Sequence, residues 1–154
     1  MDIKKIVEDL KEKYDTNNPF ELAKCLNIIV LYEELGEIKG YYNKYVRQKF
    51  IHLNNNLNEN EVLFTCGHEL GHAIMHPNSN TPFLKSNTLS SVNSLEIQAN
   101  KFSVDLIIDD DKIKELLEVH HFTTYDISKY FGVSDDIIEY KIKSLYRKKL
   151  KKFY

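Results

Sequence analysis

Hydrophobic residues recur every three or four positions at the start of the chain, which is the period of an amphipathic helix. The apolar stripe consists of Ile3, Ile6, Val7, Leu10 and Tyr14. A second helix is expected from Pro19 to about residue 27, because proline following Asn18 suits the first position of a helix. The pattern therefore predicts two amphipathic helices before residue 28.

From residue 28 the composition becomes β-branched and aromatic, in three runs over 28–35, 38–48 and 49–57. Short connections between successive strands are typical of an antiparallel meander. The sequence therefore predicts a small antiparallel three-stranded sheet. We expect the run 49–57 to lie at its edge, where an extended peptide could add as another strand.

Helical patterns dominate the remainder of the chain. Asn60 is the expected cap of a helix over 61–76, and Asn93 or Ser94 that of a helix over 95–108. The polar stretch between them, 77–94, is expected to be a loop. Three shorter helical patterns follow, at 111–119, 124–131 and 135–150. We expect one α+β domain over 1–154, with a core over 1–110 and a helical extension over 111–154.

Composition narrows the classes of protein that fit. With 154 residues, 42% hydrophobic and 29% charged, the chain suits one globular domain and excludes collagen, coiled-coil and low-complexity classes. A net charge of -2 gives no field for nucleic acid or an anionic membrane. No leader-like apolar run occurs, so we expect a cytoplasmic protein, with Cys25 and Cys66 as reduced, buried thiols.

Residues 68–72 spell His-Glu-Leu-Gly-His within the predicted helix 61–76. His68 and His72 project from one helical face about one turn apart, so both imidazoles can reach a single Zn²⁺. Glu69 lies beside them and can take up a proton from water. Gly67 and Gly71 each cost about 1 kcal/mol relative to Ala in a helix interior, which predicts that another element packs closely against this backbone.

A catalytic zinc needs a third protein ligand. Glu96 is the candidate, and Asn100 four residues later shares its helical face and could bond a ligand histidine. Residues 93–96 also fit a capping box in which Glu96 only bonds the helix start, and spacing leaves both readings open. His76 would extend the histidines over about 12 Å, too far to share one ion, so we expect it to support a ligand.

These motifs resemble those of the ImmA/IrrE family of zinc metallo-endopeptidases, most closely its ImmA branch. The resemblance rests on the histidine motif ending in His76 and on a downstream Glu96, Ala99, Asn100 and Phe102 pattern, and it covers about two-thirds of the chain. It implies a zincin-like, gluzincin-type core with one Zn²⁺ per chain. The family's ligands fall on His68, His72 and Glu96, with Glu69 as the catalytic acid and base.

Peptide hydrolysis by this set would have Glu69 take a proton from water and pass it to the leaving amine. A group that stabilises the developing oxyanion is also expected. The candidates, which the sequence does not rank, are Tyr41, Tyr42, His52, His120 and His121.

The resemblance also implies a partner: a helix-turn-helix repressor of a phage or an integrative or conjugative element, whose cleavage derepresses that element. The alternative is a non-hydrolytic sensor or antirepressor with the same fold. Residues 126–145 themselves resemble a helix-turn-helix, but Asp135 and Asp136 would meet phosphate at the start of its reading helix. We therefore expect no direct binding to nucleic acid, no membrane association and a monomer.

Overall fold

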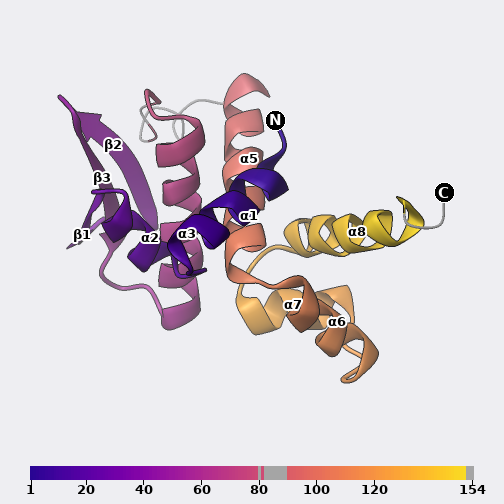
Figure 1. Ribbon diagram of the computed structural model, residues 1–154. Helices are drawn as coiled ribbons and strands as arrows, with labels where there is room; N and C mark the ends of the chain where they lie inside the picture. The colour runs from indigo at the N-terminus through magenta and orange to yellow at the C-terminus, as the bar shows by residue number, and fades with distance from the viewer. Residues whose placement is uncertain (80, 82–89, 152–154) are drawn as a thin grey trace. The chain divides into compact units, whose positions relative to one another are not determined.

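The computed structural model describes residues 1–79, 81 and 90–151, which form an α+β fold (Figure 1). In chain order its elements are α1 (Ile3–Tyr14), α2 (Pro19–Cys25), β1 (Ile29–Glu33), β2 (Gly40–Tyr45), β3 (Gln48–Asn54), α3 (Glu59–Met75), α5 (Ser90–Ile107), α6 (Asp110–Glu118), α7 (Thr124–Phe131) and α8 (Asp135–Lys151). The chain divides into two compact units, Met1–Ile107 and Ile108–Tyr154. The single domain with a boundary near residue 110 stays a prediction.

The two N-terminal helices are confirmed, and each starts at a side-chain cap. Asp2 accepts a hydrogen bond from the backbone N–H of Lys5, and Asn18 accepts one from that of Phe20. One thiol prediction is wrong: Cys25, at the end of α2, is exposed, whereas Cys66 is buried, and both are free. Cys25 lies on the solvent side of a short helix whose buried face is formed by Leu22 and Ala23.

The three strands are confirmed, but their predicted antiparallel meander is wrong, since the strand order is β1-β3-β2. β3 pairs parallel to β1 and antiparallel to β2, so the sheet is mixed. Residues 34–39 carry the chain past the place where β3 inserts. The Asn54 side chain holds this connection by donating to the carbonyls of Gly36 and Ile38, both at 2.9 Å.

β3 is therefore the central strand and not an edge, which corrects its predicted place as the site of strand addition. Its side chains Ile51 and Leu53 are fully buried in the core that the sheet shares with α3. The outer strands of the sheet are β1 and β2. At Tyr42 of β2 the outer edge is taken by Thr81, whose hydroxyl accepts from the Tyr42 N–H and donates to the Tyr42 carbonyl.

α3 lies between the sheet and α5 in the first unit (Figure 1). It begins at Glu59, two residues before the predicted start, because Asn58 and not Asn60 forms the cap. The Asn58 side chain accepts from the Glu61 N–H at 2.9 Å, and the Glu61 carboxylate accepts from the Asn58 N–H at 3.4 Å. This reciprocal capping box fixes the start of the helix that carries the histidine motif.

α5 begins at Ser90, well before the predicted start at residue 95. Asn93 and Ser94 therefore lie inside the helix, and neither caps it. The loop predicted over 77–94 falls partly on residues 80 and 82–89, which lie outside the described residues. Its last part, 90–94, is helical.

The three C-terminal helices are confirmed. Thr123 and Asp126 form a capping box at the start of α7, and Gly132 ends that helix in the left-handed conformation with a φ of 70°. Inside this unit Lys141 is 2% exposed and its ammonium lies 3.1 Å from an Asp110 carboxylate oxygen.

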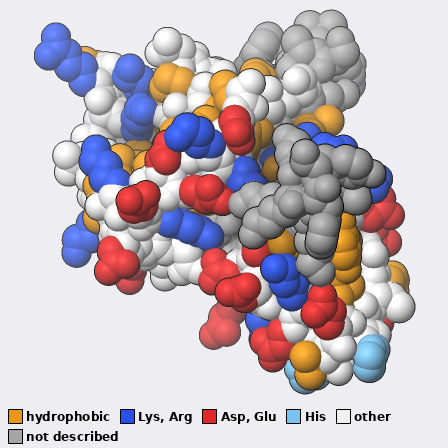
Figure 2. All heavy atoms as spheres, turned by 45° about the vertical axis from the view of Figure 1, so that its right-hand side comes forward, with side chains coloured by type: hydrophobic (Ala, Val, Ile, Leu, Met, Phe, Trp, Pro, Cys, Tyr) orange, Lys and Arg blue, Asp and Glu red, His pale blue; other side chains and the backbone are white. Residues whose placement is uncertain are grey.

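The surface carries both signs of charge. Lys and Arg side chains alternate with Asp and Glu side chains on the face shown in Figure 2, which agrees with the small net charge. Over the described ranges, no helix combines the length and the apolar character that crossing a membrane requires.

Candidate metal centre

One face of α3 brings together the side chains of the histidine motif. His68, Glu69 and His72 each offer a donor atom, and these atoms lie within 4.8 Å of one another. Glu69 and His72 are fully buried, while the His68 side chain is 14% exposed. Over the described residues this is the group of three that could hold a metal ion.

Glu96 reaches this group from α5. Its two carboxylate oxygens lie 2.9 Å from Nε2 of His68 and 2.9 Å from Nε2 of His72. Because α5 starts at Ser90, Glu96 lies in the second turn and does not cap the helix, so the capping-box alternative is wrong. The structure thus brings the three predicted ligands to one point.

The outer nitrogens of both histidines also have partners. Nδ1 of His68 lies 2.7 Å from the Asn100 side-chain oxygen. Nδ1 of His72 lies 3.0 Å from Nδ1 of His76, whose Nε2 lies 2.7 Å from the Gln98 side-chain oxygen. When the amide oxygens accept, Nε2–H of His76 donates to Gln98, and Nδ1 of His76 accepts a hydrogen bond from Nδ1–H of His72. In the neutral rings of both His68 and His72, Nε2 then keeps the lone pair that a metal needs.

Gln98 was missed by sequence reasoning. The signal that could have found it is the position of His76 one turn beyond His72, which needs an acceptor to fix its own tautomer.

The electrostatics of the cluster suit a cation. Burial raises the pKa of the Glu96 carboxyl, but hydrogen bonds with His68 and His72, and then their charges, outweigh it and hold this pKa well below its usual range. Burial lowers the pKa of His76, and its hydrogen bond to Gln98 offsets this only in part. An ionised carboxylate and two imidazoles whose Nε2 atoms face it form a donor set that fits Zn²⁺.

The glycines of the motif allow α5 to approach, as predicted. A Cβ at Gly67 would collide with the Ser103 hydroxyl, and one at Gly71 would lie 3.1 Å from the Phe102 Cβ. The two helices therefore pack backbone against side chain, which lets the short carboxylate arm of Glu96 reach both histidines.

The candidates for the oxyanion group lie in different places. Tyr42 is fully buried and its hydroxyl donates to the Pro77 carbonyl at 2.7 Å. The Tyr41 ring stacks on His52, with ring centroids 4.1 Å apart. Nδ1 of His52 lies 2.8 Å from Oε1 of Glu33, and Nε2 of His52 lies 2.6 Å from Oδ1 of Asn43. Both contacts run across the sheet.

His120 and His121 belong to the second unit, where His120 lies 3.4 Å from Glu115. The role of all five candidates stays a prediction.

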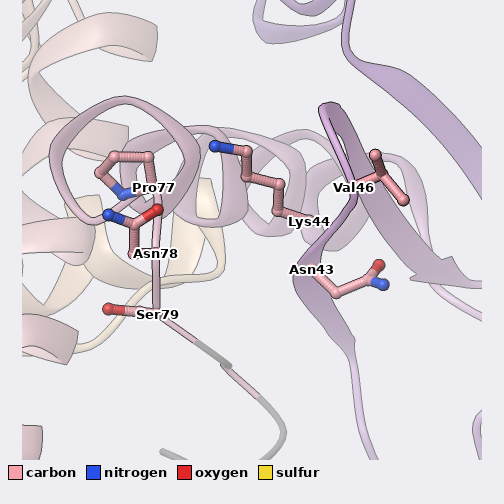
Figure 3. A pocket seen from close by; sticks show the side chains of 6 residues that line it. All are labelled: Asn43, Lys44, Val46, Pro77, Asn78 and Ser79. Atoms are coloured by element: carbon pink, nitrogen blue, oxygen red, sulfur yellow. The ribbon is translucent and has the colours of Figure 1, made fainter.

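A hollow of about 330 Å³ lies beside the end of β2 (Figure 3). The hairpin supplies Asn43, Lys44 and Val46, and the segment after α3 supplies Pro77, Asn78 and Ser79. Lys44 extends from the strand toward Pro77 (Figure 3).

A His-Glu-His cluster on one helix, met by a carboxylate from the next, is the donor arrangement of a metallopeptidase. Residues 23–143 match the peptidase family described as the IrrE N-terminal-like domain, and the chain belongs to this family. The resemblance to the ImmA/IrrE family is thereby confirmed, and family membership supports a peptidase function.

Two relatives are similar over most of the chain. An uncharacterized immunity region protein 2 of Bacillus phage phi105 is 44% identical over 140 residues, which cover 90% of this chain and 88% of the phage protein. The metallopeptidase ImmA of Bacillus subtilis strain 168 is 31% identical over 146 residues, covering 93% of this chain and 85% of ImmA.

A solved structure of a Mycobacterium tuberculosis transcriptional regulator is similar in fold. It has a TM-score of 0.56 at 12% identity and covers 89% of this chain. At this identity the likeness concerns the fold alone, and the chain spans 44% of that protein's length.

Proposed function

We propose that this chain is a zinc-dependent endopeptidase that cleaves a specific intracellular protein. The observation that carries the proposal is the Glu96 carboxylate, whose two oxygens lie 2.9 Å from Nε2 of His68 and from Nε2 of His72. A buried Glu69 stands beside them. The metallopeptidase relative and the family support the same reaction.

Each residue of the metal centre has a separate role in this proposal. His68, His72 and Glu96 would hold one Zn²⁺, which supplies a Lewis acid and lowers the pKa of water. Glu69 takes a proton from the attacking water and delivers it to the leaving amine. Asn100 keeps the proton of the His68 ring on Nδ1, away from the metal side.

The substrate we propose is a helix-turn-helix repressor of a phage or an integrative or conjugative element, cut in the cytoplasm so that the element is derepressed. The relative from a phage immunity region supports a setting in a mobile element. The hollow beside β2 supports a protein substrate that binds as an extended segment.

Zinc content tests the ligand set. Elemental analysis of protein purified without chelators should give about one zinc per chain in the parent, with clear loss in Glu96→Ala. Glu12→Ala, which removes an exposed carboxylate of α1, is the matched control and should keep its zinc. Zinc retained by Glu96→Ala would remove Glu96 from the ligand set, and a zinc-free parent would overturn the proposal.

The reaction is tested with Glu69→Gln. Parent or variant is co-expressed with the helix-turn-helix repressors of the element that carries its gene, and repressor fragments are followed by intact-mass spectrometry. We expect zinc to stay bound and cleavage to fall about 10²-fold or more, since the proton carrier is lost. Full derepression by Glu69→Gln would instead support the non-hydrolytic antirepressor.

A further inference from the structure

The turn that joins β2 to β3 contains a backbone conformation that its residue rarely adopts. Val46 has a φ of 58° and is 78% exposed. Two-residue hairpin turns normally place Asn, Asp or Gly at positive φ, and a β-branched residue there is a genuine outlier. Neither burial nor packing of the Val46 side chain compensates for this cost, because the side chain faces solvent.

A second unfavourable feature lies next to this turn. Lys44 on β2 and Lys49 on β3 are direct cross-strand partners, and opposed like charges destabilise a sheet. Within the described ranges, neither these lysines nor Arg47 forms an ion pair with an acidic side chain. Burial lowers the pKa of Lys49, and the charge of Lys44 lowers it further. In the described part of the chain, the hairpin therefore carries three cationic side chains that no acidic side chain pairs with.

These cations border a pocket of about 440 Å³ in the first unit. Its lining includes the cationic side chains of Lys44, Arg47 and Lys49, together with apolar side chains, among them Leu10, Leu26 and Ile74. None of the described residues that line it is acidic. The Lys49 ammonium already donates to the Ala73 carbonyl at 2.7 Å, so Lys44 and Arg47, both exposed, are the cations available to a ligand.

We propose that this pocket binds an acidic segment of the protein substrate that also carries an apolar side chain. The carboxylates would pair with Lys44 and the Arg47 guanidinium, and the apolar side chain would contact the apolar residues of the lining. An acidic occupant would offset the opposed lysines, which fits the rule that local costs gather where function needs them.

The proposal rests on the proposed function, because it assigns the occupant to the substrate. Ile74 belongs to α3, the helix that carries His68 and His72, so the pocket and the metal centre share one rigid element. A segment held here would keep the substrate on the unit that cuts it.

The probe for the test is a fluorescein-labelled peptide of sequence Glu-Glu-Leu-Leu-Glu-Glu, with binding followed by fluorescence polarisation at low ionic strength. One analogue replaces each Glu by Lys, and another replaces each Leu by Ser. All proteins carry Glu69→Gln, so binding is measured without hydrolysis. Failure of the peptidase function would leave this binding intact.

The pocket variant is Lys44→Glu combined with Arg47→Glu. Its matched control, Lys5→Glu combined with Lys13→Glu, changes the net charge equally at exposed positions of α1 that do not line the pocket. We expect the pocket variant to weaken binding at least about 10-fold, while the control stays within about 2-fold of the parent, because two close ion pairs are reversed only in the former. Both analogues should bind more weakly than the probe.

Thermal unfolding separates lost binding from lost folding. Lys44→Glu alone places a carboxylate opposite Lys49, so its Tm should rise by about 2 °C even as its affinity for the probe falls. Equal affinity of the pocket variant and the control variant would overturn the proposal. Tight binding of the lysine analogue would exclude an acidic ligand, and tight binding of the serine analogue would exclude the apolar contact.

Discussion

Each ligand histidine has a hydrogen-bond acceptor beside its Nδ1 atom. This acceptor determines that the proton of the neutral ring lies on Nδ1. The Asn100 oxygen accepts a hydrogen bond from Nδ1–H of His68, and Nδ1 of His76, whose tautomer Gln98 fixes, accepts one from Nδ1–H of His72. Both rings therefore turn Nε2 toward Glu96. Because a histidine that must also find its tautomer binds metal less tightly, these partners should raise the affinity of the site for a metal ion.

Replacing Asn100 tests this effect. Asn100→Ala removes the acceptor of His68 while leaving all three proposed ligands, and zinc affinity should fall about 10-fold to 100-fold in competition with a chromophoric chelator. Asn100→Asp keeps an acceptor at the same place and should retain most of the affinity. If Asn100→Ala binds zinc as tightly as the parent, the contact with His68 does not orient the ring.

The two thiols should differ in reactivity. Burial, and then the charge of Glu69, raises the pKa of the Cys66 thiol, whereas Cys25 is exposed. Because the thiolate is the reacting form, iodoacetamide at pH 8 should modify one thiol quickly in the folded protein and both after unfolding. Cys25→Ser should remove the fast reaction, as measured by intact mass. Fast modification of two thiols in the folded protein would contradict the burial of Cys66.

Between elements, the contact that forms the site is the packing of α5 on α3. Gly67→Ala should destabilise the protein by about 1–3 kcal/mol, because the new methyl group collides with Ser103, although alanine regains about 1 kcal/mol of helix propensity. The same collision pushes Glu96 away from the histidines, so zinc affinity should fall with stability. Denaturant unfolding and chelator competition measure the two effects.

Ser103→Ala provides the compensating change. It removes the hydroxyl that lies nearest to the new methyl group, so the double variant Gly67→Ala with Ser103→Ala should recover part of the lost stability and zinc affinity. Ser103→Ala alone loses the hydrogen bond from its hydroxyl to the Phe64 carbonyl and serves as the reference. Additive losses in the double variant would show that the collision is not the cause.

The helices were predictable because their apolar periodicity is local, but the order of the strands was not. The alternation of apolar and polar residues along β1 and β3 is the same whether the two strands pair parallel or antiparallel. The direction of pairing depends instead on the path of residues 34–39. The start of α5 was missed because Ser90 and Ser91 give no apolar signal. For Glu96, ligand and cap were equally compatible with spacing. The family resemblance favoured the ligand, and the start of α5 at Ser90 rules out the cap.

At the scale of the whole molecule, the proposed functions gather in one unit. The metal centre and the pocket beside the hairpin are both formed by residues of Met1–Ile107. The second unit contains an ion pair of its own, between the buried Lys141 on α8 and Asp110 at the start of α6. Two compact units that are each stabilised by their own contacts can unfold separately.

Lys141→Met should therefore loosen the second unit alone. The Lys141 side chain is 2% exposed and that of Asp110 is 30% exposed. Without the lysine, water still reaches part of the Asp110 carboxylate. The free energy of unfolding of the second unit should therefore fall by about 1–3 kcal/mol, which is less than the usual cost of breaking a fully buried ion pair. Hydrogen exchange followed by mass spectrometry should show faster exchange in 108–151, with α3 and the zinc content unchanged.

A paired variant identifies the cause of that loss. Asp110→Asn with Lys141→Met removes both charges and should recover most of the protection, because the carboxylate that had faced Lys141 is also gone. Lost protection in α3 as well as in 108–151 would mean that the two units open as one cooperative body. The metal centre would then depend on the C-terminal helices for its stability, and zinc binding in turn would protect them.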